Sequence, residues 1–581
     1  MPNEIDIARN RQLLVAAQEK GRFSTLGAFF RLSGPGWLQS AITLGGGSLG
    51  SALYLGVLGG TSMLWLNLIA IIVGVIMLSS ISYVVLSSGE RPLKAINEHV
   101  NPVLGVGWVT ATVLANMIWV LPQFGLCFDI LNKNLLPGVV QDDDSFKYGV
   151  SIVLFLLATG MVYLNLGGGW ASRVFDIVLK LIVAAIVVSF VAVVVSLFQQ
   201  DQINLTEILT GLIPRPDQWF SPVASVTALL NDLPASAQDF WSTKFISNQR
   251  NVMISTTATV VGINMTFLLP YSMLNRGWDR PFRGLATFDL ITGLAIPFVI
   301  VTSCIVIASA FSFHSKADEN FLSSDPATVV QSPVFGDASK FIMQRAQSDD
   351  ASLNVSEFDE DQIAAFVAGS TAEERTLAAM LVKPNTGQLA KSLEPLLGKR
   401  YANLVFGFGV FGMGFSTLIV LMMINGFAIA ELFGMPRSMG LKMFGAVVAG
   451  LIGTMWPMIW AGESKTWLII LASTFGAILL PIAYIAFFAL MNSRALLKDD
   501  MLTGGRRLFW NILMGFGVAA ALAQAISSLY TKLFDAETGS MIQLHPGSMI
   551  FGGIVTFALL ALIGFSATRR SNPETNSEAK P

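Results

Sequence analysis

The chain has 581 residues, of which 53% are hydrophobic and only 13% are charged. Soluble domains carry about 25% charged residues, so the composition excludes an ordinary soluble protein and indicates an all-α protein that crosses a membrane several times. The formal net charge of −2 gives no sign of a nucleic-acid partner. We expect none, and the lipid bilayer is the partner that the composition implies.

Hydropathy predicts about twelve membrane-spanning helices, each close to the length needed to cross the hydrocarbon core. In chain order they cover residues 35–60, 62–86, 103–126, 148–165, 171–198, 253–275, 285–312, 402–426, 441–461, 465–491, 509–531 and 547–567. The resulting domains are an amino-terminal segment (1–33), helices 1–7 (34–312), an insertion (313–400), helices 8–12 (401–568) and a tail (569–581).

Lysine and arginine concentrate in alternate loops, which sets the orientation of a membrane protein. With this bias the segments 1–33 and 569–581 are cytoplasmic, and the chain is a multi-pass protein of the cell membrane. The polar, acidic insertion 313–400 then lies outside the cytoplasm. We expect a solvated loop there, with a short amphipathic helix near Thr371 to Val382. The alternative is a cap that binds a partner of unknown identity.

Two of the predicted helices look interrupted. The first contains Gly45–Gly47, and each glycine is roughly 1 kcal/mol less favourable than alanine inside a helix. The sixth contains Asn264, Met265 and Thr266 ahead of Pro270. Broken helices at corresponding places in two halves indicate an inverted-repeat transporter with its binding site near the bilayer midplane. We therefore expect two related sets of five helices, followed by two accessory helices.

Several motifs resemble those of NRAMP-type metal transporters. They are the opening Gly34-Pro35-Gly36-Trp37-Leu38, the glycine-rich eighth span from Gly407 to Thr417, and the tenth span with Leu479 to Ala483 and Met491 to Ser493. The resemblance covers most of the membrane part but not residues 313–400. It implies the LeuT-like fold of two inverted five-helix repeats, in which helices 1 and 6 are broken.

The chain departs from this family at the residues that bind metal. The family carries Asp-Pro-Gly-Asn at the first break, and counting from the shared Gly-Pro-Gly places Gly45, Gly46, Gly47 and Ser48 at those positions. At the family's Met-Pro-His in span six, one register gives Leu269 and Tyr271, and the other gives Thr266 and Leu268. A thioether favours soft transition metals, so its loss changes the expected substrate. The metal ligands are therefore unknown.

Proton coupling also departs from the resemblance, which implies ionisable residues on helices 3, 6 and 9. Spans three and nine lack charges in their interiors, and span six has none before Arg276. The nearest charged pair is Asp176 and Lys180 in span five, whose i, i+4 spacing allows them to pair.

These observations predict a secondary-active transporter of a small solute or ion. The first hypothesis is a hydrated divalent cation or another inorganic ion, because the Asp, Asn and Met ligands are missing. The alternatives are a transporter of a small anion or zwitterion held by glycine amides, and a receptor that does not transport. We expect no enzyme and no cofactor, because no zinc motif, paired intramembrane aspartate or Ser/Lys dyad occurs. The candidate substrate-binding residues are Gly45, Gly46, Gly47, Ser48, Asn264, Met265, Thr266, Leu269, Tyr271 and Ser416.

Overall fold

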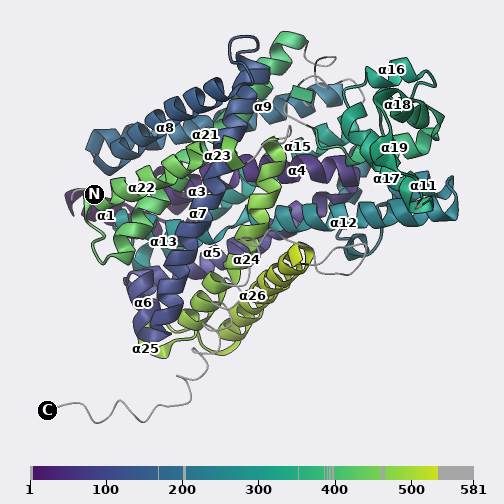
Figure 1. Cartoon of the computed structure of the whole chain (residues 1–581). Coiled ribbons are helices and arrows are strands. Elements are labelled where there is room, and N and C mark those ends of the chain that lie inside the picture. The colour runs from purple at the N-terminus through teal and green to yellow at the C-terminus, as the bar shows by residue number, and fades with distance from the viewer. Residues whose placement is uncertain are drawn as a thin grey trace.

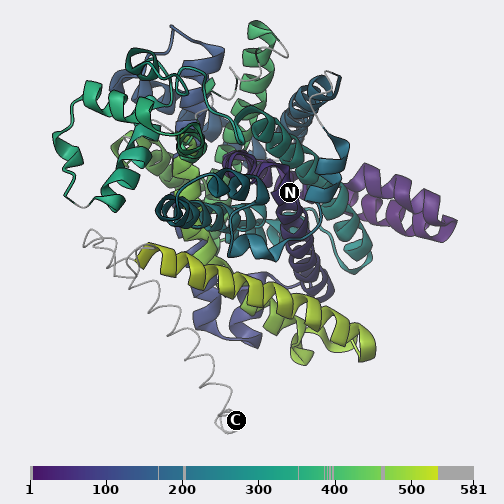
Figure 2. The ribbon, with the colours of Figure 1, turned by 90° about the vertical axis from the view of Figure 1, so that its right-hand side faces the viewer.

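The computed structural model describes residues 4–167, 169–199, 204–350, 352–384, 387, 388, 390, 394, 398–459 and 465–533. This part of the chain is helical throughout and contains nine helices that are long and apolar enough to cross a membrane. The helices pack into one bundle, shown in two orthogonal views in Figures 1 and 2.

The amino-terminal half begins with a pair of helices ahead of the first membrane segments. Its elements are α1 (Glu4–Lys20), α2 (Arg22–Leu32), α3 (Pro35–Thr43), α4 (Gly46–Gly59), η1 (Gly60–Met63), α5 (Leu64–Ser88), α6 (Pro92–His99), α7 (Pro102–Ile130), η2 (Leu131–Leu135), α8 (Asp144–Gly167) and α9 (Gly169–Gln199). Proline at the first helical position starts α3, α6 and α7, because its missing N–H has no partner there anyway.

The second half starts with short connecting helices and repeats the same plan. It comprises α10 (Leu205–Gly211), η3 (Pro216–Trp219), α11 (Ala224–Asn231), α12 (Ala235–Val260), α13 (Ile263–Asn275), η4 (Arg280–Phe282), α14 (Arg283–Leu290), η5 (Ile291–Ala295), α15 (Ile296–Phe313), α21 (Lys399–Leu432), α22 (Met439–Thr454), α23 (Trp456–Ile459), α24 (Lys465–Met491), α25 (Arg494–Leu497), η7 (Lys498–Asp500) and α26 (Gly504–Leu533).

Within the described residues, the first eleven predicted spans each coincide with one helix or with two or three consecutive helical segments. The twelfth, 547–567, lies outside the described residues. Both sets of five begin with a broken helix, α3 with α4 and α12 with α13, as the repeat predicts. Spans one and two are joined by the short turn η1 alone, so α4 to α5 reads as one apolar run of 43 residues.

The insertion 313–400 contains more structure than the solvated loop that we expected. It forms α16 (Pro326–Val330), α17 (Phe335–Asp349), η6 (Val355–Glu357), α18 (Glu360–Gly369) and α19 (Ala372–Leu381). The predicted helix near Thr371 to Val382 is α19, with the Thr371 hydroxyl capping its first turn. Buried Phe321 and Leu377 belong to its core, and the guanidinium of Arg375 donates to the carbonyls of Phe321 and Ser323 at 3.3 and 2.6 Å.

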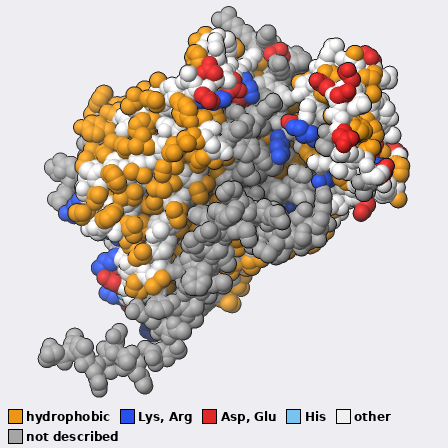
Figure 3. Space-filling view, viewed as in Figure 1, with side chains coloured by type: hydrophobic (Ala, Val, Ile, Leu, Met, Phe, Trp, Pro, Cys, Tyr) orange, Lys and Arg blue, Asp and Glu red, His pale blue; other side chains and the backbone are white. Residues whose placement is uncertain are grey.

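The outer surface divides into apolar and charged regions. Apolar side chains dominate the face formed by α8, α21 and α22, whereas acidic and basic side chains gather on the insertion at the other end of the molecule (Figure 3). On α8 and α9, the exposed residues include Leu156 and Val188, at 61% and 68%. An exposed apolar face of this kind is typical of a helix that contacts lipid.

Candidate functional site

The first break lies between α3 and α4. Helix α3 ends at Thr43, Leu44 and Gly45 are not helical, and α4 begins at Gly46. The predicted unwinding at Gly45–Gly47 is thus displaced, because Gly46, Gly47 and Ser48 form the first turn of α4. Every residue from 39 to 60 is buried, so the break is enclosed by the surrounding helices.

The second break separates α12 from α13 at Val261 and Gly262, which adopt extended backbone conformations. We expected it at Asn264–Thr266, but these residues form the first turn of α13. The Asn264 side chain accepts from the Met265 amide at 2.9 Å, and the same amide donates to the Gly262 carbonyl at 3.0 Å. The helix therefore restarts directly after Gly262.

The two breaks meet at Thr43, the last residue of α3. Its hydroxyl is 3.1 Å from the Val260 carbonyl oxygen and 3.2 Å from the Met265 sulfur, so it contacts both sides of the second break. A second link lies close by, where the hydroxyls of Ser51 and Thr259 are 3.2 Å apart. Sequence reasoning missed Thr43, although a hydroxyl residue just before the glycine run was a usable signal.

Side chains from two neighbouring helices satisfy backbone groups that the first break leaves free. The carbonyl of Ala41 accepts from the hydroxyls of Ser416 and Thr417 on α21, each at 3.1 Å. The amide of Gly46 donates to the Gln123 side-chain oxygen on α7 at 3.2 Å. Unpaired backbone groups inside a membrane are costly, so these contacts explain how the chain tolerates an unwound segment here.

Glycine is required in this segment because neighbouring side chains fill the space of a side chain. A Cβ on Gly45 would lie 2.0 Å from the Thr417 hydroxyl oxygen, and one on Gly46 would lie 2.7 Å from Gln123 Oε1. At Gly47, it would lie 2.7 Å from Cζ3 of Trp119. The glycine run is a close-packing surface for α7 and α21 as well as the place where the helix breaks.

The remaining predicted site residues lie at different distances from the breaks. Ser48 donates from its hydroxyl to the Thr43 carbonyl, so it belongs to the first break. Thr266 accepts from the indole nitrogen of Trp108 at 3.1 Å. Leu269 and Tyr271 lie further along α13, where the Tyr271 ring stacks on Phe267 at 4.3 Å. The structure does not bring those two residues to the break.

Unpartnered amides lie in two of the helices that form this region. Gln39 on α3 and Asn116 on α7 are both 0% exposed, and neither end of either amide has a hydrogen-bond partner within the described part of the chain. The Ser40 hydroxyl, also fully buried, is in the same state. Buried polar groups are nearly always paired, so such groups are typical of a place that receives water or a polar ligand.

A carboxyl group holds the other end of α3. Asp289, on α14, accepts from the amides of Gly34 and Gly36 at 3.1 and 2.6 Å and from the Ser33 hydroxyl. A negative charge at a helix amino terminus is favourable. We call Ser33, Gly34, Gly36 and Asp289 the carboxyl clamp. The Lys180 ammonium donates to the Ser33 carbonyl at 3.5 Å; the side chain of Asp176, its expected partner, lies outside the described part of the structure.

The backbones of α3 and η5 touch beside this clamp. A Cβ on Gly36 would lie 2.1 Å from the Asp289 carbonyl oxygen. A Cβ on Gly293 would lie 2.9 Å from the Trp37 nitrogen and 3.0 Å from the carbonyl carbon of Gly36. The opening Gly-Pro-Gly motif therefore allows a close approach between two membrane segments.

The membrane helices contain buried acidic residues that sequence reasoning overlooked. Asp289 lies within predicted span seven, and the observed α21 extends beyond predicted span eight to include Glu431, which is 3.5 Å from Arg91. Helix α7 likewise continues to Ile130 and includes Asp129, 1% exposed and 2.7 Å from Lys133. Asp129 lies beyond the end of predicted span three, 103–126, whose interior contains no charged residue, as expected. Ionisable residues within membrane segments were the signal that could have found all three.

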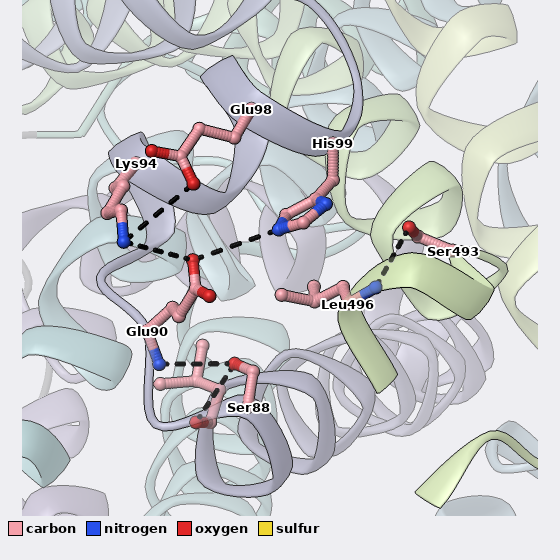
Figure 4. Close-up of polar contacts among 8 residues, drawn as sticks. Ser88, Glu90, Lys94, Glu98, His99, Ser493 and Leu496 are labelled. Atoms are coloured by element: carbon pink, nitrogen blue, oxygen red, sulfur yellow. Dashed lines mark hydrogen bonds and ion pairs between the residues drawn. The ribbon is translucent and has the colours of Figure 1, made fainter. Parts of the chain in front are cut away.

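A separate group of metal-ligand type lies at α6, apart from the breaks. Among the described residues, Glu90, Glu98 and His99 have ligand atoms within 4.8 Å of one another. Figure 4 shows Lys94 between the two glutamates, with its ammonium 3.9 Å from Glu90 and 3.7 Å from Glu98. The ammonium already pairs with both carboxylates, so we assign the group as an ion-pair network.

Comparison with known proteins supports the fold. Among solved structures, a manganese transporter of Eremococcus coleocola in complex with an aromatic bis-isothiourea substituted compound matches with a TM-score of 0.63 and 13% identity, over 95% of this chain and 97% of that one. Two variants of that transporter, with histidine changed to alanine and glutamate changed to glutamine, each match with a TM-score of 0.52 and 13% identity, over 94% of this chain and 96% of theirs. No curated protein matches by sequence.

The family model described as "Natural resistance-associated macrophage protein-like" matches residues 36–346 and 363–531. The match includes most of the 313–400 insertion, which we expected to fall outside the resemblance. Together with the helical bundle, the two broken helices and the shared fold, this match shows a polytopic membrane protein of a metal-ion transporter family. The chain belongs to the Nramp family.

Proposed function

We propose that this protein is a secondary-active transporter whose substrate site lies where the two helix breaks meet, and that the substrate is a divalent cation that keeps part of its water shell. Family membership supports transport of a metal ion. The proposal of a hydrated cation rests on the contact between Gly45 and Thr417. Position 45 is where the resemblance places the metal-binding aspartate.

The Thr417 hydroxyl occupies the space that a side chain at position 45 would need. The space that an aspartate side chain at position 45 would fill is thus taken by Thr417 on α21. We expect such a replacement in a site whose ligand chemistry has changed. The oxygen atoms that could face a cation at the breaks are then neutral: hydroxyl, side-chain amide and backbone carbonyl oxygens. They include the Thr43 hydroxyl, the Gln123 amide oxygen and the Ala41 carbonyl oxygen.

Neutral oxygen ligands suit a hydrated cation better than a cation without its water. Divalent cations that shed their water usually require charged carboxylates, whereas Mg²⁺ gives up water reluctantly and is bound partly through it. The unpartnered amides of Gln39 and Asn116 can each donate and accept, which is what hydrogen bonds to a water shell require. Met265 is less suited as a soft ligand, because its sulfur already accepts from Thr43.

The alternative of an anion or zwitterion bound by glycine amides has less support. It needs free N–H groups at the start of α4, but the Gly46 amide donates to Gln123. A receptor that does not transport remains the third hypothesis. Its distinguishing result is ligand binding without uptake.

The test is uptake into proteoliposomes of Mg²⁺, Mn²⁺ and chloride, with and without a proton gradient. We expect uptake of Mg²⁺ or Mn²⁺ that exceeds chloride uptake. Gly47→Leu should abolish it by filling the break, because position 47 already abuts Trp119. Gly160→Leu is the matched control, since nothing lies within 4 Å of a Cβ there. Uptake of chloride but of neither metal would overturn the proposal, as would normal transport by Gly47→Leu.

A gain-of-function variant tests the altered site directly. Gly45→Asp with Ser48→Asn restores the family's ligand types, and Thr417→Ala removes the hydroxyl that fills the space. We expect calorimetry to detect tighter Mn²⁺ binding by the triple variant than by the double variant that retains Thr417. A folded triple variant that binds no Mn²⁺ would place the missing ligands in α13.

The orientation remains part of this proposal. We place both termini in the cytoplasm of a cell-membrane protein and residues 313–400 on the outer side. The insertion contacts α4 and α12 through α19 and α17, so it covers the ends of both broken helices. Labelling an exposed cysteine at Lys340→Cys from outside intact cells, but not one at Gln18→Cys, is the expected result.

A further inference from the structure

We propose that α2 is an interfacial anchor, whose outward face binds the headgroup region of the same membrane that the protein spans, with a preference for anionic phospholipid. The inference does not depend on the substrate. It concerns a surface outside the breaks, which the transport proposal leaves without a role.

The outward face of α2 is apolar and exposed. Phe23, Leu26 and Phe30 have exposed fractions of 92%, 42% and 68%, and Gly27 is exposed beside them. Positions 23, 26, 27 and 30 follow the i, i+3, i+4, i+7 spacing, so they share one side of the helix. Two phenylalanines exposed on one short helix face form a patch that needs a partner.

The opposite face of α2 is fixed to the protein. Ala28 is buried, the Phe29 ring lies 5.3 Å from that of Phe288 on α14, and α1 packs along the helix. The Phe30 ring stands nearly perpendicular to that of Phe288, with ring centroids 5.0 Å apart, and Phe30 still presents most of its surface outward. The apolar face is therefore held in place, and the α1–α2 pair projects sideways from the bundle (purple, Figure 2).

The charges around this face fit anionic headgroups. Lys20, Arg22 and Arg31 are exposed, and residues 20–33 contain no aspartate or glutamate. Basic residues flanking an apolar helix face are typical of helices that lie in the interface plane, where the cations reach lipid phosphates.

Continuity with the membrane segments favours lipid over another partner. Only Ser33 and Gly34 separate α2 from α3, which enters the bundle directly. Helix α2 thus ends close to the level at which the chain enters the bilayer, and its apolar face extends the lipid-facing surface of the bundle. A protein partner or a second copy would have to compete with lipid at this depth.

The experiment measures membrane depth on the full-length protein. Cys127 and Cys304 are buried and are replaced by alanine, and a nitroxide label is attached at Phe23→Cys or Phe30→Cys. Gln18→Cys on α1 is the matched exposed control. In liposomes of phosphatidylcholine with phosphatidylglycerol, we expect the ratio of oxygen to nickel-chelate accessibility at 23 and 30 to exceed that at 18 by about threefold or more.

Headgroup preference is tested by changing lipid and charge separately. In phosphatidylcholine alone, or after Lys20, Arg22 and Arg31 are all changed to Gln, the accessibility ratio at positions 23 and 30 should fall at least about twofold. Equal nickel accessibility at 18, 23 and 30 would overturn the anchor. Dipolar coupling between labels at position 30 of two molecules would do so too, because it would identify a second copy as the occupant. A ratio unaffected by lipid charge would overturn the anionic preference.

Discussion

Replacing Asp289 by asparagine should release the amino-terminal end of α3. The two carboxyl oxygens accept from two buried amides and one hydroxyl, and the asparagine NH₂ group would face at least one of those N–H donors in either orientation. Hydrogen bonds to charged groups contribute about 1.5–3 kcal/mol, and a buried donor left unpaired costs about 1–3 kcal/mol. A loss of about 3 kcal/mol changes the equilibrium between docked and released α3 roughly 150-fold.

The assay follows a cysteine at Ser40→Cys, on α3, in a background where Cys127 and Cys304 are alanine. Ser40 is fully buried, so alkylation by a water-soluble maleimide in open membrane fragments reports release of the helix. We expect Asp289→Asn to raise the alkylation rate about 100-fold. Asp279→Asn is the control, because its ion pair with Arg11 is exposed and worth about 1 kcal/mol or less. A rise below about threefold for Asp289→Asn would refute the clamp.

Three further predictions follow from other contacts. Gly36→Ala should lower the unfolding temperature markedly, because its Cβ would lie 2.1 Å from the Asp289 carbonyl oxygen. Gly27→Ala is the control and should not lower it, since the space around Gly27 is open. Equal unfolding temperatures for the two variants would contradict the close approach at Gly36. Thr43→Val should lower the free energy of unfolding by about 1 kcal/mol and should abolish most of the transport rate. Thr292→Val is the control, because the Thr292 hydroxyl bonds to Phe288 one turn away along the same run of helix. Normal uptake by Thr43→Val would exclude Thr43 from the site. Burial lowers the pKa of His314, so the unfolded chain takes up a proton near pH 6.5 that the folded chain refuses, and stability should fall as the pH drops from about 7.5 to about 5.5. In calorimetry this fall should shrink in His314→Gln, and an unchanged fall would exclude His314 as its source.

The sequence predicted the position of each membrane helix in the described chain well, because a long apolar run can be recognised from local composition without knowledge of the fold. It placed the breaks within a few residues. The errors have a physical cause: Gly46 and Gly47 lie in the first turn of α4, where the missing side chains leave room for Gln123 and Trp119, and a hydropathy pattern cannot reveal such packing.

Contacts between distant segments were beyond sequence reasoning. Ser33 and Asp289 are 256 residues apart, and nothing local to either predicts that they bond. The same holds for Thr43 with Val260, 217 residues away, which joins the two breaks. The glycines of the Gly-Pro-Gly motif were visible as a family resemblance, but the reason for them, a neighbouring backbone, required the fold.

The approach of Gly36 to Gly293 bears on how α3 could move. Main chain meets main chain at this joint, and the side chains of Trp37 and Asp289 border it. The two segments can keep this close approach during a movement only while both positions are glycine. Polar bonds hold α3 at both ends, through the carboxyl clamp at one and through Ala41 and Thr43 at the other, so a displacement of α3 along its length has to part both sets.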